Sequence, residues 1–291
     1  MTGSSDACEA DRCHKVEAIR RQEDGSLLVD IKNQAPIVAD AVMIATGSSA
    51  GGYELAKNLG HTITELAPSL FSFKVEDALI KDLSGLSFEN AEVHLKIPAA
   101  KTFTERGPLL ITHWGVSGPA VLKISAWAAR EMLRADYKAD LKVNWLGLKL
   151  KEDVVALLQK IKAENAKSQV HNIYPDQLAK RFWLNVLAKA SVPEDRRWAD
   201  ASNRELNLIA EILFATQFKV LGKNRYKDEF VECGGVNLKE VDFKTMQSKV
   251  CPGVYFAGEI LDIDGITGGF NFQNAWTGGW IAAQDMAGSG E

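Results

Sequence analysis

The residues best suited to chemistry lie near the C-terminus, where glycines and an acid follow a short apolar run. This run, Val254 to Ala257, ends at Gly258 and is followed at once by Glu259, and a glycine-rich turn spans 265–269. Glycines let backbone N–H groups approach a ligand closely, and a carboxylate accepts hydrogen bonds from sugar-type hydroxyls. The pattern suits a nucleotide-type ligand, although packing and turn geometry alone would explain the same glycines.

The elements that must position this turn are a strand before it and a helix after it. The apolar run predicts a short buried strand. After the turn, apolar residues recur at steps of three and four, which predicts a helix with one apolar face. This predicted face consists of Phe272, Ala275, Trp276, Gly279, Ala282, Ala283 and Met286. The start of such a helix offers free N–H donors and a positive dipole end to an electron-rich group.

Several stretches together resemble one flavoprotein family, commonly described as NAD(P)/FAD-dependent oxidoreductases, which includes aminoacetone oxidase and bile-acid enone reductases. The stretches that carry the resemblance are 45–47, 112–119, 234–242, 245–246, 253–259, 262–265 and 267–271. It runs from about residue 15 to the C-terminus. The sequence is therefore identified as similar to a flavin-dependent oxidoreductase with an unassigned small-molecule substrate.

The resemblance implies FAD as cofactor, hydride transfer through it, and NAD(P)H as a reductant. It places Gly258 and Glu259 by the ribityl or ribose hydroxyls, and Thr46 and Gly47 near the adenosine side. The flavin pyrimidine edge would lie against Gly268, Gly269, Phe270 and Asn271. No catalytic residue is evident, and His113 is the one candidate.

One family feature is missing, because the sequence contains no G-x-G-x-x-G. That motif opens a βαβ unit whose helix N-terminus holds the pyrophosphate of the cofactor. We therefore expect an incomplete FAD-binding domain, to which a missing N-terminal segment or a partner chain would add the rest. The alternative is a non-enzymatic remnant, a binding module that has lost the pyrophosphate loop.

Ser49 raises a third possibility, because Gly47 to Gly51 matches the G-x-S-x-G nucleophile elbow of hydrolases. An α/β-hydrolase needs several strands before that serine, whereas the residues before Ser49 predict a hairpin. The hydrolase is therefore the least favoured hypothesis.

His113 opens the stretch His113 to Pro119, which has two readings. His113 and Ser117 at a helix N-terminus could hold an anionic or carbonyl group. Alternatively, the stretch is only a tight turn that starts a helix, with Ser117, Gly118 and Pro119 as its capping residues. His113 and Trp114 are not explained by capping.

The architecture that we predict is α/β, with a discontinuous FAD-binding-like domain formed by residues 1–72 and 227–291. An inserted second domain, 73–226, would contain strands followed by helices. Asp24-Gly25 predicts a hairpin within 15–32, and strict alternation over 91–97 predicts a strand. Helices are expected near 151–167, 175–190 and 203–215, and Ser202 and Glu205 form a capping box for the last of these.

The composition is that of an ordinary globular protein, with 46% hydrophobic and 25% charged residues and a net charge of −4. This charge gives no electrostatic case for nucleic acid or membrane partners, and we expect neither. The N-terminus lacks an apolar signal core, so a cytoplasmic location is expected. Cys8, Cys13, Cys233 and Cys251 form no C-x-x-C pair, so no metal site is expected.

Overall fold

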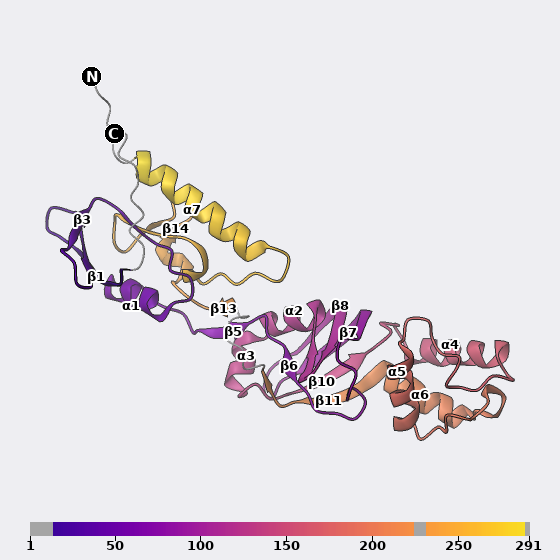
Figure 1. The fold of residues 1–291 in the computed structure, drawn as a ribbon. Helices are drawn as coiled ribbons and strands as arrows, with labels where there is room; N and C mark the ends of the chain where they lie inside the picture. Colours follow the sequence, from indigo (N-terminus) through magenta and orange to yellow (C-terminus); the bar gives the residue numbers. More distant parts are fainter. Residues whose placement is uncertain (1–13, 224–230, 289–291) are drawn as a thin grey trace. The chain divides into compact units, whose positions relative to one another are not determined.

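The computed structural model describes residues 14–223 and 231–288 of the chain (Figure 1). Cys8 and Cys13 lie outside the described residues. The chain divides into two compact units. Unit 1 comprises residues 1–66, 234–263 and 269–291, and unit 2 comprises 67–233 and 264–268. The sequence-based limits fell at 72/73 and 226/227, so the two divisions differ at 67–72, 227–233 and 264–268.

Unit 1 contains a three-stranded antiparallel sheet of β1 (Val16–Arg21), β2 (Leu27–Ile31) and β3 (Ile37–Ala39). The hairpin predicted at Asp24-Gly25 is confirmed, since β1 pairs with β2 around it. Gly25 takes a φ of 92°, and the Asp24 carboxylate accepts a hydrogen bond from the Ser26 N–H at 2.9 Å. A positive φ at this point suits glycine, which lacks a Cβ that would clash.

A second sheet in unit 1 has the strand order β14-β15-β16-β4. Its members are β14 (Val241–Asp242), β15 (Gln247–Ser248), β16 (Val254–Phe256) and β4 (Val42–Ile44). The pair β16–β4 is parallel, whereas the other pairs are antiparallel. Helix α1 (Ala50–Asn58) follows β4, and the short 3-10 helices η3 (Leu238–Glu240) and η4 (Gly258–Ile260) flank the sheet strands in sequence.

The C-terminal helix of unit 1, α7 (Phe270–Gly288), exists as predicted, but only part of its predicted apolar face, including Ala282 and Met286, packs against the core. The buried positions are Gly278 and Ala282, while Phe272, Trp276 and Trp280 are 68%, 71% and 66% exposed. A Cβ on Gly278 would lie 3.2 Å from Met246 Cε and 3.9 Å from Ala257 Cα. The small residues therefore allow close approach to the sheet, and the aromatic side chains lie elsewhere on the helix surface.

Unit 2 is built on a seven-stranded sheet, in the order β11-β10-β7-β8-β9-β6-β12 among the described residues. The strands are β6 (Phe73–Lys74), β7 (Ser87–Lys96), β8 (Thr102–Thr112), β9 (Gly115–Ser117), β10 (Ala139–Asn144), β11 (Thr216–Val220) and β12 (Gly222–Lys223). The long segment of unit 2, residues 67–233, begins with β5 (Ala67–Ser69) and ends with β13 (Val231–Cys233). These two strands pair antiparallel.

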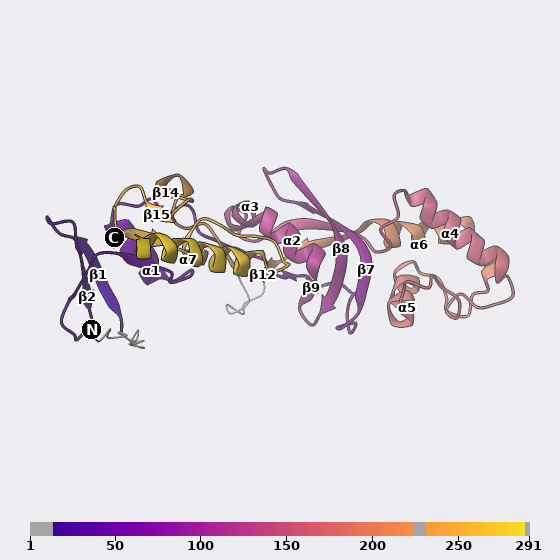
Figure 2. The same ribbon diagram turned by 90° about the horizontal axis from the view of Figure 1, so that it is seen from above.

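The helices of unit 2 form two groups. Helices α2 (Pro119–Trp127) and α3 (Ala129–Arg134) belong to the sheet region, and both figures show α2 lying beside β8 (Figure 2). Helices α4 (Lys151–Glu164), α5 (Lys180–Lys189) and α6 (Asn203–Ala215) pack together as a second group, which also includes the 3-10 helix η1 (Trp198–Asp200). The predicted capping box is confirmed, since Ser202 and Glu205 exchange hydrogen bonds at the start of α6.

One continuous core joins the sheet of unit 2 to its helices. Trp145 is central to it, with ring centroids 4.6 Å from Phe88, 4.7 Å from Phe182 and 6.0 Å from Phe218. Its indole N–H donates to the Thr216 hydroxyl at 2.9 Å, so the one polar atom of the side chain is satisfied. Among the described residues, no helix has the length and apolar character needed to cross a membrane.

Candidate cofactor edge and substrate pocket

The carboxyl ends of β4 and β16 meet at one edge of the second sheet of unit 1. The register pairs Val42 with Val254 and Ile44 with Phe256, and the N–H of Ala257 donates to the Ile44 carbonyl at 3.3 Å. The chain segments that leave this edge carry Thr46 and Gly47 on one side and Gly258 and Glu259 on the other. In open α/β sheets, ligands bind outside the carboxyl ends of the strands, so this edge is the candidate cofactor site.

Glycine geometry at this edge fits a ligand that approaches the backbone. Gly47 has a φ of 59° and Gly269 a φ of 83°, and a Cβ at either position would meet no atom within 4 Å. Gly258 also has a positive φ, of 78°, but its surroundings are different. A Cβ added there would lie 3.4 Å from the Cβ of Ala275 on α7. Gly258 thus lets α7 pack closely, whereas Gly47 and Gly269 leave open space.

The remaining residues expected at the cofactor lie around the glycine turn. Glu259 lies in η4 directly after β16, and Phe270 and Asn271 form the first turn of α7, with Phe270 58% exposed. Gly268 has a φ of 127° and is grouped with unit 2, so the boundary between the units falls inside the turn. The structure therefore gathers Thr46, Gly47, Gly258, Glu259 and the start of α7 within unit 1.

Ser49 has a structural role at this edge. It is the N-cap of α1, and its hydroxyl accepts a hydrogen bond from the Gly52 N–H at 3.1 Å. Gly52 itself is required there, because a Cβ would lie 1.8 Å from Thr46 Oγ1. The G-x-S-x-G match thus corresponds to a helix cap followed by a close contact between the loop and α1.

A serine, a histidine and a glutamate elsewhere in unit 1 have the order of a hydrolase triad but not its exposure. His61 Nε2 lies 2.8 Å from Ser248 Oγ, and His61 Nδ1 lies 3.2 Å from Glu240 Oε2. His61 and Ser248 are buried, and Ser248 Oγ already accepts from the N–H groups of Val250 and Cys251 at 3.0 and 2.7 Å. The hydroxyl must therefore donate to His61, which fixes its hydrogen in a structural network.

Burial lowers the pKa of His61, against the opposing effects of the hydrogen bond and negative charge of Glu240. The imidazole is therefore neutral at pH 7, with Nδ1–H donating to Glu240 and Nε2 accepting from Ser248. Desolvation raises the pKa of Glu240, but hydrogen bonds from Thr62 and then His61 outweigh it, and the net pKa is lowered. A neutral histidine and an ionised glutamate hold these segments together.

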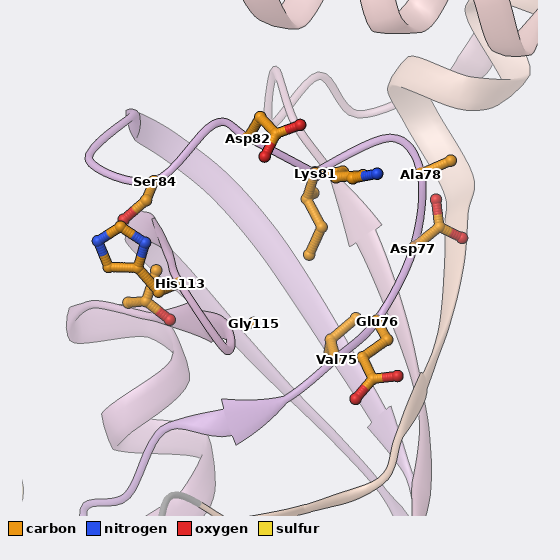
Figure 3. Close-up of a pocket in the computed structure, with 11 residues that line it drawn as sticks. Val75, Glu76, Asp77, Ala78, Lys81, Asp82, Ser84, His113 and Gly115 are labelled. Carbon is orange, nitrogen blue, oxygen red and sulfur yellow. The ribbon is translucent and has the colours of Figure 1, made fainter.

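Unit 2 contains a cavity of about 520 Å³ between the 75–84 segment and the β8–β9 turn (Figure 3). This volume lies in the range of small-molecule sites, roughly 300–1,000 Å³. Its polar lining includes Lys81, Ser84, Thr112 and His113 together with three acids, Glu76, Asp77 and Asp82. Thr112 Oγ1 is buried and has no hydrogen-bond partner in the described part of the chain. A buried hydroxyl without a partner is costly, and since this oxygen has almost no exposed surface, a ligand group would satisfy it only after a small shift of the surrounding side chains.

The structure confirms part of the second reading of the stretch from His113 to Pro119, since α2 begins at Pro119 directly after its N-cap Gly118, but Ser117 is not a capping residue. His113 and Trp114 form the turn between β8 and β9 and do not start a helix. The N-cap of α2 is Gly118, with a φ of 92° and no side-chain cap bond, and the Ser117 hydroxyl instead pairs with that of Ser72 at 2.7 Å. The reason is steric, since a Cβ at Gly115 would lie 2.3 Å from the Phe73 carbonyl oxygen. The tight β6–β9 pairing sets this turn, and His113 lines the cavity through it.

Comparison with known families connects unit 2 to a defined domain. The family described as HI0933-like protein barrel and H2TH domain matches residues 67–231, more than half of the chain. The chain belongs to the HI0933-like family. The match begins at β5 and ends within β13, so it coincides with the long segment of unit 2. In this family, a flavin such as FAD is the cofactor, and the members are flavoprotein oxidoreductases.

Three curated relatives extend the likeness to the rest of the HI0933-like chain. Ribosomal RNA dihydrouridine synthases of Escherichia coli and Haemophilus influenzae are 29% and 28% identical, each over 94% of this chain and 66% of the relative. The 3-dehydro-bile acid delta(4,6)-reductase of Clostridium scindens is 26% identical over 94% of this chain and 68% of the relative. The chain thus spans about two thirds of the length of these relatives.

The residues of the cofactor edge fit a flavin nucleotide. Positive-φ glycines with open Cβ positions let backbone N–H groups approach a ligand, and Glu259 follows the strand end at that edge. Sequence reasoning missed the cavity of unit 2 and the residues Thr112, Lys81, Asp82 and Ser84. No periodicity marks them, since they come from loops and a strand end. Asp82, with a φ of 60°, is unusual only in its backbone, which a sequence does not reveal.

Proposed function

We propose that this HI0933-like chain takes part in the flavin-dependent reduction of a carbon–carbon double bond conjugated to a carbonyl group. Two relatives are named for making dihydrouridine, and the third for reducing delta(4,6) bonds of a 3-dehydro bile acid. Dihydrouridine is uridine with its ring double bond beside a carbonyl saturated, and the 3-dehydro bile acid carries a ketone conjugated with the bonds reduced. The shared chemistry is addition of a hydride to the electron-poor end of a double bond conjugated with a carbonyl, which is the β-carbon in uracil, and of a proton to a carbon nearer the carbonyl.

The reaction balances with NAD(P)H as reductant. The substrate gains a hydride and a proton, NAD(P)H becomes NAD(P)⁺, and the product is the saturated carbonyl compound. Bound FAD would supply the two-electron transfer between reductant and substrate. The protein contributes binding, orientation and the proton.

The observation that carries the proposal is the parallel β4–β16 edge in a chain of this flavoprotein family. Glu259 would accept hydrogen bonds from ribityl or ribose hydroxyls, and Thr46 and Gly47 would contact the adenosine side. Gly268 to Asn271 would lie along the pyrimidine edge, where the dipole of α7 favours negative charge on the reduced ring. The open Cβ positions of Gly47 and Gly269 support this assignment.

In unit 2, Thr112 and His113 are the proposed substrate-binding pair. The Thr112 hydroxyl would donate to the substrate carbonyl, which satisfies a buried group that has no partner in the described part of the chain. His113 lines the same cavity and could deliver the proton to the α-carbon. We expect Thr112→Val to raise KM and His113→Gln to lower kcat, with His171→Gln, which does not line this cavity, as control.

A uracil base in RNA is the substrate that we favour. Residues 67–231 contain 25 Lys and Arg against 20 Asp and Glu, a net charge of +5, whereas the rest of the chain contains 9 against 18, a net charge of −9. A basic domain attracts the phosphate backbone. The total charge of −4, on which we expected no nucleic-acid partner, conceals this asymmetry.

The test is to incubate the purified chain with excess FAD, NADH and a uridine-containing RNA, and to measure dihydrouridine by mass spectrometry. The proposal predicts a gain of two hydrogens per reduced base. The Gly269→Val variant should not form dihydrouridine, because the valine side chain would fill the open space and strain a backbone with positive φ. Gly279→Val is the matched control, because Gly279 lies within α7 with open space and no positive φ. FAD binding without reduction of either RNA or an enone steroid would refute the reaction, and absence of FAD binding would favour a remnant.

A further inference from the structure

Unit 2 has a second hollow, of about 420 Å³, at one end of the strands β7, β10 and β11. Its lining combines an apolar floor with a basic rim. We call its apolar residues, which include Pro98, Val220 and Leu221, the floor, and its charged residues, three lysines (Lys96, Lys138 and Lys219) and one acid (Asp140), the rim. Leu221 is 46% exposed, which is unusual for a leucine directly after a strand of alternating burial. The cavity that contains Thr112 and His113 shares no residue with this hollow.

The charges around the hollow are not balanced. Lys219 pairs with Asp140, and Lys138 pairs with Asp136 at 2.8 Å. Lys96 lies opposite Asp140 in the strand register but has no ion pair in the described part of the chain. Adjacent strands lie about 4.8 Å apart, so Lys96 and Lys219, two strands apart, are separated by about 10 Å across the sheet. The rim thus presents spaced cations beside an apolar surface.

The same outer face of the sheet continues this positive character. The register places Lys142 between Gln217 and His94, and Arg106 opposite Glu92. Four cations, at Lys96, Lys142, Lys219 and Arg106, thus share this face with two acids, Asp140 and Glu92. Burial, followed by the positive charge of Lys142, lowers the pKa of His94, so His94 is neutral at pH 7 and adds no charge.

We infer that this face is a binding surface for single-stranded RNA, with an unstacked base over the apolar floor and phosphates on Lys96 and Lys219. Single-stranded nucleic acid is bound by apolar or aromatic platforms for bases combined with cations along the backbone. The net charge of +5 on residues 67–231 supports a polyanion. A bile acid carries a single carboxylate and would pair with only one lysine, whereas a polyanion would use several of these cations. The inference rests on the proposed function for its choice of RNA.

The test measures binding of a fluorescein-labelled oligouridylate to the full chain by fluorescence anisotropy over a range of salt concentrations. Lys96→Ala/Lys219→Ala removes two rim cations, and Lys160→Ala/Lys180→Ala removes two exposed cations from α4 and α5 of the same unit. We expect the rim variant to bind at least about tenfold more weakly and its salt slope to fall by about 1.4, because each phosphate contact on a single strand contributes about 0.7. Leu221→Ser should weaken binding without changing that slope.

Equal weakening by the rim and control variants would show that only net charge matters and would overturn the inference, as would a rim variant that binds like the wild type. Reduction of free uridine nucleotide by the chain is measured in parallel. If it occurs while the rim variant binds RNA normally, the surface is wrong and the proposed reaction stands. If the binding pattern holds and no dihydrouridine forms, the surface stands and the reaction is wrong.

Discussion

The two units differ in how far each buries its own apolar surface. Unit 2 encloses a core that runs from its sheet into the helices, with Trp145, Trp183 and Trp198 fully buried. Unit 1 buries a smaller set of residues and exposes Phe272, Trp276 and Trp280 along α7. In the β14-β15-β16-β4 sheet of unit 1, β4 lies at one end among the described residues. Residue type alone would not separate buried from exposed tryptophans, since unit 2 itself buries three of them and leaves Trp114 and Trp127 36% and 57% exposed.

The largest effect that we expect concerns the affinity of unit 1 for FAD. The sequence offers no G-x-G-x-x-G, so two or three charge-assisted hydrogen bonds to the pyrophosphate are expected to be missing, each worth about 1.5–3 kcal/mol. The dissociation constant should then be roughly two to six orders of magnitude higher than with that motif, at about 1.4 kcal/mol per tenfold. Titration of FAD into the purified chain measures this, and stoichiometric submicromolar binding would contradict it.

A second prediction compares a buried and an exposed tryptophan. Trp145→Ala should lower the free energy of unfolding of unit 2 by about 3–5 kcal/mol, because it leaves a cavity and a Thr216 hydroxyl without its donor. Trp276→Ala should change the free energy of unfolding of unit 1, to which α7 belongs, by no more than about 0.5 kcal/mol, as for most surface substitutions. Chemical denaturation followed by circular dichroism measures both, and similar losses would refute the contrast.

The third prediction uses the His61 network to follow unit 1 alone. The folded state lowers the pKa of His61 below 6.5, so the unfolded chain binds the proton first. Unfolding free energy should therefore be fully retained above pH 6.5 and fall as the pH drops below it. Lowering of the Glu240 pKa adds a further loss as the pH falls below 4.5. His61→Gln should flatten the first of these losses, and an unchanged profile would show that His61 does not report on folding.

The smallest effect is expected at Ser49. Ser49→Ala removes the cap of α1 and should cost about 1 kcal/mol of stability. Any reductase activity should remain, because the serine does not act as a nucleophile. Ser49→Asp, which also caps helices well, should restore stability. Covalent labelling of Ser49 by a fluorophosphonate probe would contradict this and would support a hydrolase.

Local signals in the sequence predicted most of the elements. Asp24-Gly25 and the capping box of Ser202 and Glu205 act within a few residues, so their geometry follows from the chain itself. The face of α7 did not follow, because periodicity shows which residues share a side but not whether small or large residues form the contact. The position of His113 in the β8–β9 turn also did not follow. It depends on the approach of Gly115 to the Phe73 carbonyl, a contact across 42 residues of sequence.

The pairing of β5 with β13 bears on how this architecture could have arisen. Ser69 lies opposite Val231 and Ala67 opposite Cys233, so the segment that enters unit 2 and the segment that leaves it run side by side. Insertion of one domain into another is tolerated when the ends of the insert are adjacent. The stretch from 67 to 233 therefore has the form of a cassette, which could have entered a surface loop of an ancestral protein in a single recombination event. For the same reason it could be cut out at this ladder and expressed, or transplanted, as one piece.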